Sequence, residues 1–199
     1  MEHSKHRAVF IDRDGTLNVE KNYVHKIADF EFINGAIEAV RLLNESSFKV
    51  VVISNQSGIA RGYYTPNDVH ILQDHIQREL RKQKAHIDAF FYCPHHPEGT
   101  VEEFRKICDC RKPKPGMVLQ AEQKLELDLP HSYVIGDHLS DIRLRESVPV
   151  TTILVKTGHG EETLKQLQGA TVKPDRIEEN LLDAVKQIIH LTTYSNLQM

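Results

Sequence analysis

The strongest constraint on the fold is a series of short apolar runs separated by segments with helical periodicity. The runs are Ala8–Ile11, Phe48–Ile53, Ile87–Tyr92, Ser132–Ile135 and Thr151–Val155. Helices are predicted over Gly35–Asn44, Pro66–Gln83, Gly116–Leu125 and Leu139–Ser147, with a last one over Ile177–Ile189. Strands that alternate with helices at this spacing form right-handed βαβ units. The sequence therefore predicts an α/β protein with a parallel sheet covered on both faces.

The chain of 199 residues has an ordinary globular composition, with 40% hydrophobic and 27% charged residues. We therefore expect one domain over residues 1–199, with a polar C-terminal tail at residues 191–199. The net charge of -3 offers no general basic field for nucleic acid. Residues 1–7 show no signal-peptide core, and the longest apolar run, Phe48–Ile53, is too short to cross a bilayer. A cytoplasmic protein without a nucleic-acid or membrane partner is predicted.

Polar side chains follow several of the predicted strands. Asp12, Ser54, Lys112 and Asp137 all lie just after a strand or in the loop that follows one. In open parallel sheets, ligands bind beyond the carboxyl ends of the strands. The alternative is that loops are polar wherever they occur. That explains each residue singly, but it explains less well why their chemistry fits together.

Two aspartates separated by one residue follow the first predicted strand, in the segment Asp12-Arg13-Asp14-Gly15-Thr16. In such a turn, one carboxylate can reach a metal while the other approaches a leaving group. A carboxylate can attack phosphorus if a divalent cation and fixed donors shield the repulsion between the anions. Gly15 would let the backbone turn sharply over a phosphate. The structural alternative is a simple turn.

The three cysteines of the chain, Cys93, Cys108 and Cys110, lie within eighteen residues of one another, close to His95 and His96. An odd number of cysteines is a poor disulfide framework. Three thiolates and one imidazole instead complete a closed tetrahedral zinc site of the structural type. From spacing alone, either histidine can be the fourth ligand. The alternative is a loop with reduced, unligated thiols.

Four motifs follow one another in order: residues 12–16, then Ser54-Asn55, then Lys112, then Gly136-Asp137 with Asp141. This series resembles the haloacid dehalogenase superfamily. The resemblance implies a Rossmann-like, doubly wound parallel sheet. Because the irregular insertions at residues 18–33 and 93–115 are short, we expect no large cap domain. A zinc-binding loop at residues 93–110 is expected within the second insertion.

The resemblance also implies the roles of the motif residues. Asp12 would be the covalent nucleophile, and Asp14 would act first as general acid and then as general base. Ser54 and Asn55 would hold phosphoryl oxygens, and Lys112 would neutralise the developing charge. Magnesium would be bound by the side chains of Asp12 and Asp137 and by the backbone carbonyl of Asp14.

Three longer segments, residues 54–62, 92–97 and 108–116, are similar to the zinc-containing branch of this superfamily. The resemblance extends over about residues 8–173. In that branch the first histidine, His95, is the zinc ligand together with Cys93, Cys108 and Cys110. The chain departs from the pattern at His138, where relatives often carry Lys or Arg. The residues implied to contact substrate are Glu20, Lys21, Asn22, Tyr23, Gln56, Ser57, Arg61 and Arg111.

The substrate expected from this branch is a small phosphorylated metabolite. The predicted specificity segments supply the cations Lys21, Lys26, Arg61 and Arg111 against the single acid Glu20. Cations suit a second phosphate, and the resemblance to the heptose-bisphosphate members of this branch implies removal of the 7-phosphate of a heptose 1,7-bisphosphate. Histidinol phosphate is the alternative substrate, and Arg111 alone does not distinguish the two. The Arg61 loop and residues 22–25 resemble the heptose enzymes, which favours the heptose.

Two other classes of protein fit parts of the sequence. A zinc-stabilised nucleic-acid-binding module would need a basic, aromatic-rich face, which the charge and the 7% aromatic content oppose. An inactive interaction protein would not need Asp12, Asp14, Lys112 and Asp137 together. A magnesium-dependent phosphatase with a structural zinc ion, expected to be a monomer, is therefore the leading hypothesis.

Overall fold

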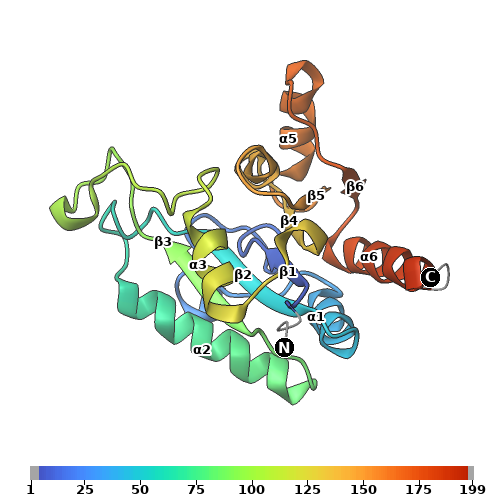
Figure 1. Cartoon of the computed structure of the whole chain (residues 1–199). Coiled ribbons are helices and arrows are strands. Elements are labelled where there is room, and N and C mark those ends of the chain that lie inside the picture. Colours follow the sequence, from blue (N-terminus) through green and yellow to red (C-terminus); the bar gives the residue numbers. More distant parts are fainter. Residues whose placement is uncertain (1–4, 197–199) are drawn as a thin grey trace.

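A six-stranded parallel sheet forms the centre of the protein, whose computed structural model describes residues 5–196 (Figure 1). The strands are β1 (Ala8–Ile11), β2 (Lys49–Asn55), β3 (Ala89–Cys93), β4 (Tyr133–Gly136), β5 (Thr151–Val155) and β6 (Arg176–Glu178). Their order in the sheet is β3-β2-β1-β4-β5-β6, and every pair is parallel. The strands after β1 are added first on one side of it, as β2 and β3, and then on the other side, from β4 onward. The strand order therefore reverses at β1, which pairs with both β2 and β4.

Helices cover both faces of the sheet, as expected for strands that are apolar on both sides. One face packs against α1 (Ala36–Glu45), α2 (Pro66–Lys82) and α6 (Leu181–Asn196), and the other packs against α3 (Gly116–Leu125), α4 (Leu139–Ile142) and α5 (Gly160–Gln166). Single 3₁₀ turns lie at Ile27–Asp29, Glu102–Phe104, Leu129–His131, Arg143–Glu146 and Leu167–Gly169. This is the α/β sheet that the sequence predicts.

The alternation of side chains along β1 and β2 divides the core into two layers. Val9 and Val50 belong to the layer under α1, α2 and α6, whereas Phe10 and Val51 belong to the layer under α3. All four are fully buried. Successive residues of a strand point to opposite faces, so a continuous apolar run fills both layers at once.

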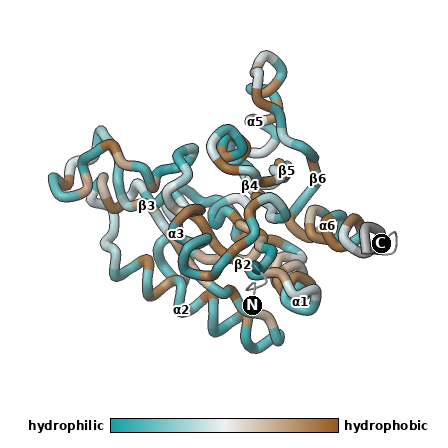
Figure 2. The backbone as a smooth tube through the Cα atoms, in the orientation of Figure 1, coloured by the Kyte–Doolittle hydropathy of each residue, from teal (hydrophilic) through white to brown (hydrophobic). Residues whose placement is uncertain are grey.

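Helix α2 shows how local sequence places an element on the sheet. Thr65 and Asp68 form a reciprocal capping box, and Pro66 occupies the first turn, where no backbone donor is needed. The buried side chains of the helix are Val69, Leu72, Ile76 and Leu80. Their spacing of three or four residues puts them on one face, which Figure 2 shows as apolar patches alternating with polar ones along α2.

The predicted elements after β4 need correction. The expected helix Leu139–Ser147 is a short α4 followed by the 3₁₀ turn Arg143–Glu146, and α5 was not predicted. The expected helix Ile177–Ile189 is wrong at its start, because residues 176–178 form β6 alongside β5. Helix α6 begins at Leu181, after the side chain of Asn180 accepts a hydrogen bond from the amide of Asp183 (3.0 Å).

The predicted boundaries at the ends of other elements also shift. Strand β2 runs on to Asn55, and β3 begins at Ala89 and runs on to Cys93. Ser54 and Cys93 therefore lie within strands. Of the predicted C-terminal tail, residues 191–196 belong to α6, and residues 197–199 lie outside the described residues. The two insertions stay short and carry single 3₁₀ turns, so no large cap covers the described part of the sheet. Among the described residues, no helix is both long and apolar enough to span a bilayer.

Candidate active site

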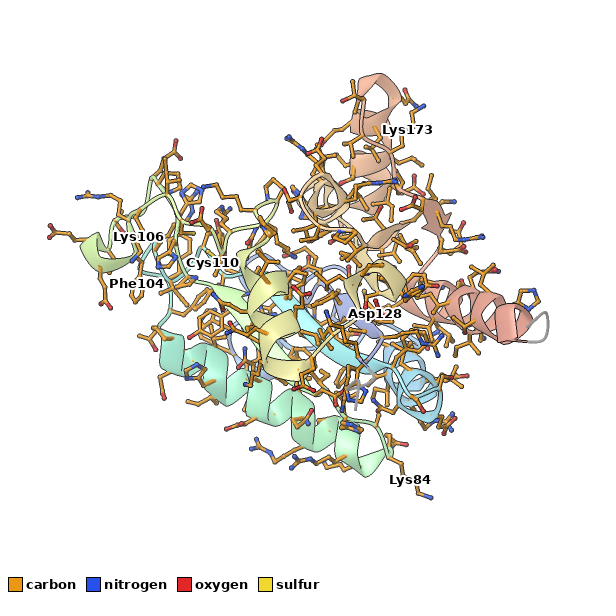
Figure 3. All side chains as sticks on the ribbon, in the orientation of Figure 1. Lys84, Phe104, Lys106, Cys110, Asp128 and Lys173 are labelled. Carbon is orange, nitrogen blue, oxygen red and sulfur yellow. The ribbon has the colours of Figure 1, made fainter. Side chains whose placement is uncertain are left out.

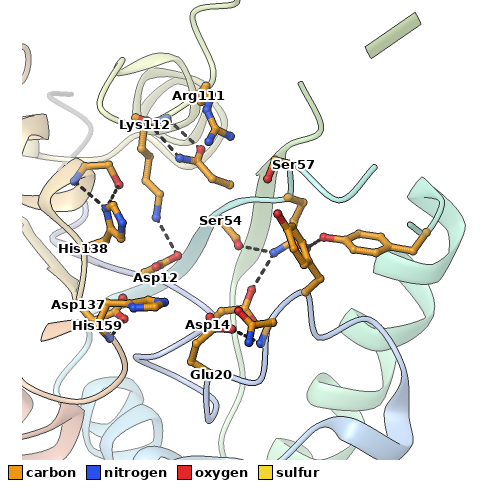
Figure 4. A pocket seen from close by; sticks show the side chains of 16 residues that line it. Asp12, Asp14, Glu20, Ser54, Ser57, Arg111, Lys112, Asp137, His138 and His159 are labelled. Atoms are coloured by element: carbon orange, nitrogen blue, oxygen red, sulfur yellow. Dashed lines mark hydrogen bonds and ion pairs between the residues drawn. The ribbon is translucent and has the colours of Figure 1, made fainter. Parts of the chain in front are cut away.

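A cavity of ≈ 330 Å³ opens at the carboxyl ends of the central strands (Figure 4). It lies where β1 is flanked by β2 and β4, which is where ligands bind in sheets of this kind. Its lining residues are Asp12, Asp14, Glu20, Asn22, Tyr23, Ser54, Asn55, Gln56, Ser57, Tyr64, Arg111, Lys112, Asp137, His138, Ser140 and His159. Most of the residues predicted from the motifs therefore meet in one place.

The buried ammonium of Lys112 joins Asp12, which lines this cavity, to the buried carboxylate of Asp141. Lys112 Nζ lies 2.8 Å from Asp12 Oδ1 and 2.6 Å from Asp141 Oδ1, and it donates to the carbonyl of Ile53 at 2.9 Å. Burial disfavours the charged ammonium, but Asp12 and Asp141 outweigh burial and hold the pKa of Lys112 above its ordinary value. Lys112 is thus a fixed positive charge beside Asp12, as Figure 4 shows.

Three carboxylates converge beside this lysine. One oxygen from each of Asp12, Asp137 and Asp141 lies within 4.8 Å of the others. Burial, and then the neighbouring acids, raise the pKa of Asp137 to about 8, whereas burial raises the pKa of Asp12 to about 7 despite Lys112. Carboxylates that resist ionisation together are stabilised as anions by a divalent cation. The donor set therefore fits a hard cation such as Mg²⁺.

Two glycines allow the backbone to approach Asp137 closely. Gly15 and Gly158 both have positive φ, at 85° and 55°. A Cβ atom on either residue would overlap with the carboxylate of Asp137. The backbone amide of His159 donates to Asp137 Oδ2 at 2.8 Å, and Thr157 Oγ1 donates to the Gly15 carbonyl at 2.6 Å. The loop after β5 therefore closes against the Asp-x-Asp-Gly turn, and Gly15 is needed for that contact as well as for the turn.

The second aspartate of the turn, Asp14, is held away from the acid cluster by donors. Arg13 is 2% exposed, and its Nε and Nη2 donate to both oxygens of Asp14 at 2.7–3.1 Å. Asn18 Nδ2 and Gln56 Nε2 donate to the same carboxylate at 3.1 and 3.0 Å. Asp14 is thus oriented by three side chains and still lines the cavity.

The two residues at the end of β2 have different surroundings. Ser54 is buried, and its Oγ accepts a hydrogen bond from Gln56 Nε2 at 2.6 Å. The side chain of Asn55 pairs with the backbone of Lys112, accepting from its N–H at 3.0 Å and donating to its carbonyl at 3.1 Å. Both line the cavity, but the amide of Asn55 is already used to fix the loop that carries Lys112.

The residues predicted to contact substrate divide into two groups. Six of the eight line the cavity; they are Glu20, Asn22, Tyr23, Gln56, Ser57 and Arg111. The other two have partners elsewhere. Lys21 Nζ lies 2.9 Å from Glu31, and Arg61 Nη2 lies 3.3 Å from His96 Nε2. Neither is part of the cavity lining.

The predicted zinc ligands come together in the loop after β3. The ligand atoms of Cys93, His95, Cys108 and Cys110 all lie within 4.8 Å of one another, and the distances between neighbours are 3.3–3.8 Å. A tetrahedron with metal–sulfur bonds of about 2.3 Å has edges of roughly 3.8 Å, so the donor set fits zinc. Figure 3 places Cys110 in this loop together with Phe104 and Lys106.

The structure separates the two candidate histidines. Nδ1 of His95 lies 3.3 Å from Cys110 Sγ. In contrast, Nδ1 of His96 accepts from the amide of Glu98 at 3.2 Å, and its Nε2 meets Arg61. Only His95 belongs to the ligand cluster, as the family resemblance implies.

Several residues that line the cavity or contact its residues were not predicted as site residues. From the sequence, Asp141 is only the second acid of its motif; it does not line the cavity, and its contact with Lys112 depends on the turn into α4. Tyr64 and Ser140 carry no motif, and His159 lies in the segment where no helix was predicted. The signal for Asp141 was its place three residues after His138, where its side chain accepts from the His138 amide at 3.1 Å and caps α4.

Comparison with known proteins agrees with this geometry. A family model described as HAD-hydrolase-like matches residues 109–184. The chain is 49% identical over 152 residues to D-glycero-beta-D-manno-heptose-1,7-bisphosphate 7-phosphatase of Escherichia coli (strain K12), a match that covers 76% of this chain and 80% of that protein. It is 42% identical over 160 residues to D-glycero-alpha-D-manno-heptose-1,7-bisphosphate 7-phosphatase of Photorhabdus laumondii, with coverage of 80% and 87%.

A solved structure supports the same relationship. D,D-heptose 1,7-bisphosphate phosphatase from B. bronchiseptica, complexed with magnesium and phosphate, superposes with a TM-score of 0.82 at 29% identity. The match covers 93% of this chain and 99% of that one. The sequence relatives, the shared fold and the ordered motifs agree. This chain belongs to the heptose-1,7-bisphosphate 7-phosphatase family of haloacid dehalogenase-like hydrolases.

Proposed function

We propose that this protein is a magnesium-dependent phosphatase that removes the 7-phosphate of D-glycero-D-manno-heptose 1,7-bisphosphate through an aspartyl-phosphate. The observation that carries the proposal is the buried Asp12–Lys112–Asp141 contact beside Asp137, at the carboxyl end of β1. It gives a carboxylate, a fixed cation and a set of metal ligands around one point. The relatives named for this reaction match the chain over most of its length.

In the first step, a carboxylate oxygen of Asp12 forms a bond to phosphorus as the bond to the sugar oxygen breaks. The carboxyl group of Asp14 gives its proton to that oxygen, so the leaving group departs as a neutral alcohol. The charge on the transferring phosphoryl group is balanced by Lys112 Nζ, which already lies 2.8 Å from Asp12. Ser54 lines the same cavity and would donate its hydroxyl to a phosphoryl oxygen.

In the second step, water attacks the phosphorus of the aspartyl-phosphate, and Asp14, now a carboxylate, takes the proton. The bond between phosphorus and Asp12 breaks, which releases inorganic phosphate and restores both aspartates. Asp12 and Asp137 would hold Mg²⁺ with the backbone carbonyl of Asp14. When bound, the ion supplies positive charge that lowers the repulsion between the carboxylate and the phosphate.

The zinc cluster has a structural role in this proposal. Cys110 stands two residues before Lys112 in sequence, and Asn55 pairs with the backbone of Lys112 from β2. A metal held by Cys93, His95, Cys108 and Cys110 would fix this loop and so aim Lys112 and Arg111 into the cavity. The four ligands leave no open coordination position for catalysis.

Arg111 is the residue proposed to bind the phosphate that is not cleaved. It lines the cavity, and its Nη1 reaches the carbonyl of His95 at 3.4 Å, which leaves much of the guanidinium free for an anion. Arg61 and Lys21, which were also expected to serve, have partners outside the cavity lining. Arg111 is therefore the main source of preference for a bisphosphate.

Phosphate release from three substrates tests the function. The β and α anomers of the heptose bisphosphate should be turned over faster than histidinol phosphate, with Mg²⁺ present. Arg111→Ala should raise KM for the bisphosphate at least about tenfold more than for a heptose 7-phosphate that lacks the second group. Arg105→Ala, an exposed arginine of the same loop, is the matched control. Faster turnover of histidinol phosphate, or equal losses on both sugars, would contradict the substrate assignment.

We also propose that residues 1–199 form one phosphatase domain. It works in the cytoplasm as a monomer, without a nucleic-acid or membrane partner. Size-exclusion chromatography with light scattering tests the monomer, and cell fractionation tests the location. A stable dimer would require that part of the proposal to be withdrawn, and the chemistry would stand.

A further inference from the structure

The side chain of Gln56 is fully used inside the protein, although the family resemblance implied that it contacts substrate. Gln56 is 1% exposed. Its amide nitrogen donates to Asp14 Oδ2 at 3.0 Å and to Ser54 Oγ at 2.6 Å. Its amide oxygen accepts a hydrogen bond from the hydroxyl of Tyr64 at 2.6 Å. A buried amide whose two ends are both occupied orients its neighbours and has little left to offer a ligand.

The hydroxyl of Tyr64 holds the oxygen end of this amide. A phenol that donates to the amide oxygen turns the amide nitrogen toward Asp14. If the amide were reversed, its oxygen would face the carboxylate and repel it. Burial raises the pKa of the Tyr64 phenol, so the hydroxyl keeps its proton and remains a donor.

Tyr64 itself is held firmly from two sides. Its ring stacks on His25, with ring centroids 4.8 Å apart and planes 14° apart. The backbone of Gly58 lies against the ring so closely that a Cβ atom there would overlap with it. His25 belongs to the insertion after β1, whereas Gly58 belongs to the loop after β2. Contacts from two loops therefore fix the position of the Tyr64 hydroxyl, which donates to the Gln56 amide oxygen.

We propose that Tyr64 is a positioning residue that holds the acid–base residue Asp14 and the phosphate-binding Ser54 through the amide of Gln56. The proposal rests on the function proposed above and adds a determinant of its rate. Neither Tyr64 nor Gln56 exchanges a proton with substrate in this account. Removing the Tyr64 hydroxyl leaves the amide oxygen of Gln56 without its donor, so the amide is no longer held at both ends and the position of its nitrogen beside Asp14 is no longer fixed. A small misplacement of a general acid can cost a large part of its contribution to the rate.

The effect must depend on the leaving group, because the two steps use Asp14 differently. A sugar alkoxide needs a proton from Asp14 in order to leave, whereas p-nitrophenolate is a stable anion and leaves without one. Both substrates then form the same aspartyl-phosphate, whose hydrolysis needs Asp14 as the base. Misplacing Asp14 should therefore slow both steps for the sugar phosphate but only the second step for p-nitrophenyl phosphate.

Tyr64→Phe tests this with the whole protein in Mg²⁺, because it removes the hydroxyl and keeps the ring that packs on His25 and Gly58. We expect kcat for the heptose bisphosphate to fall about tenfold with little change in KM. With p-nitrophenyl phosphate, stopped flow should show a burst of p-nitrophenol larger than that of the wild type and approaching one per active site. Tyr133→Phe, at the start of β4, is the matched control and should show neither effect.

A second variant separates this account from a loss of folding. Gln56→Met keeps the buried volume and removes all three hydrogen bonds, so it should show the same burst. Since both changes act through one contact, the double variant should be no slower than Gln56→Met alone. Near-UV circular dichroism and thermal unfolding check that each variant is folded.

Three results would overturn the proposal: an unchanged kcat in folded Tyr64→Phe, equal losses on both substrates without a larger burst, or additive losses in the double variant. Failure of the proposed function itself looks different. In that case the wild type would release no phosphate from any of the esters, or Asp12→Asn would remain active.

Discussion

The side chain of Asn55 holds the backbone of Lys112 by two hydrogen bonds, at 3.0 and 3.1 Å, across 57 positions of sequence. This contact joins the end of β2 to the loop that contains the predicted zinc ligands. It places the ammonium of Lys112 over Asp12 before any phosphate arrives. Preorganised positive charge of this kind is a major source of rate in phosphoryl transfer.

Asn55→Ala is expected to lower kcat by at least about tenfold while leaving zinc content unchanged, because Lys112 loses its anchor. Asn44→Ala is a closely matched control, since Asn44 makes the same pair of bonds with the backbone of His86, far from the cavity. The melting temperatures of both variants should fall by similar amounts in differential scanning fluorimetry. If Asn44→Ala loses as much activity as Asn55→Ala, the role of Asn55 is only structural.

Asp12→Asn should reduce turnover by at least about a thousandfold with the fold intact, because an amide neither attacks phosphorus nor binds a cation well. Phosphate release and trapping of a phosphorylated chain by mass spectrometry measure this. Asp74→Asn, an exposed aspartate on α2, serves as the control. Retention of a tenth of the wild-type rate would rule out covalent catalysis by Asp12.

Asp137→Asn should make the metal-free protein more stable and its stability independent of Mg²⁺. The pKa of Asp137 is raised from 3.8 to about 8 in the folded chain, mainly by burial. Above pH 3.8 the unfolded chain loses this proton while the folded chain keeps it, so the group lowers stability increasingly up to about pH 8. A gain of about 1 kcal/mol would raise Tm by roughly 2–4 °C.

The stability gain of Asp137→Asn should therefore be small near pH 4 and larger at pH 7.5. Thermal unfolding at both pH values, with EDTA and with Mg²⁺, measures it. In the wild type, Mg²⁺ should restore the stability that is lost because the acidic side chains lie so close together. A lower Tm for metal-free Asp137→Asn at pH 7.5 would show that the carboxyl group of Asp137 does not destabilise the metal-free protein.

His95→Ala should lower the zinc content, whereas His96→Ala should leave it unchanged. Elemental analysis should find about one zinc per chain in the wild type and in His96→Ala, and much less in His95→Ala, because only His95 meets the thiols. Activity should fall with the zinc in His95→Ala as the Lys112 loop loosens. Full zinc occupancy in His95→Ala would mean that the fourth ligand is another residue.

Much of the fold was predictable from the sequence, because β1 to β5 are apolar runs long enough to fill both core layers. The motifs at their ends also placed Asp12, Lys112 and Asp137 correctly in one cavity. Strand β6 was not predictable, since Arg176–Glu178 is short and partly exposed, and it is a strand only because β5 lies beside it. Helix α5 begins at Gly160, which is a poor helix former.

The directions of individual side chains were harder to predict than their loops. Arg61 and Gln56 both lie in the expected segment after β2, yet one turns to His96 and the other is buried against Asp14. Each direction is set by a partner from another part of the chain. Local sequence contains no record of such pairings, so the family resemblance implied substrate contacts for both residues.

The parallel pairing of β1 with both β2 and β4 also has a consequence for biosynthesis. Asp12 meets Lys112 across 100 positions, and Asp141 comes still later in the chain. A nascent chain that has emerged only through β3 therefore carries its nucleophile without the groups that make it reactive. Contacts so distant in sequence form late in folding. The growing protein is thus expected to stay chemically silent on the ribosome until β4 and α4 have been made.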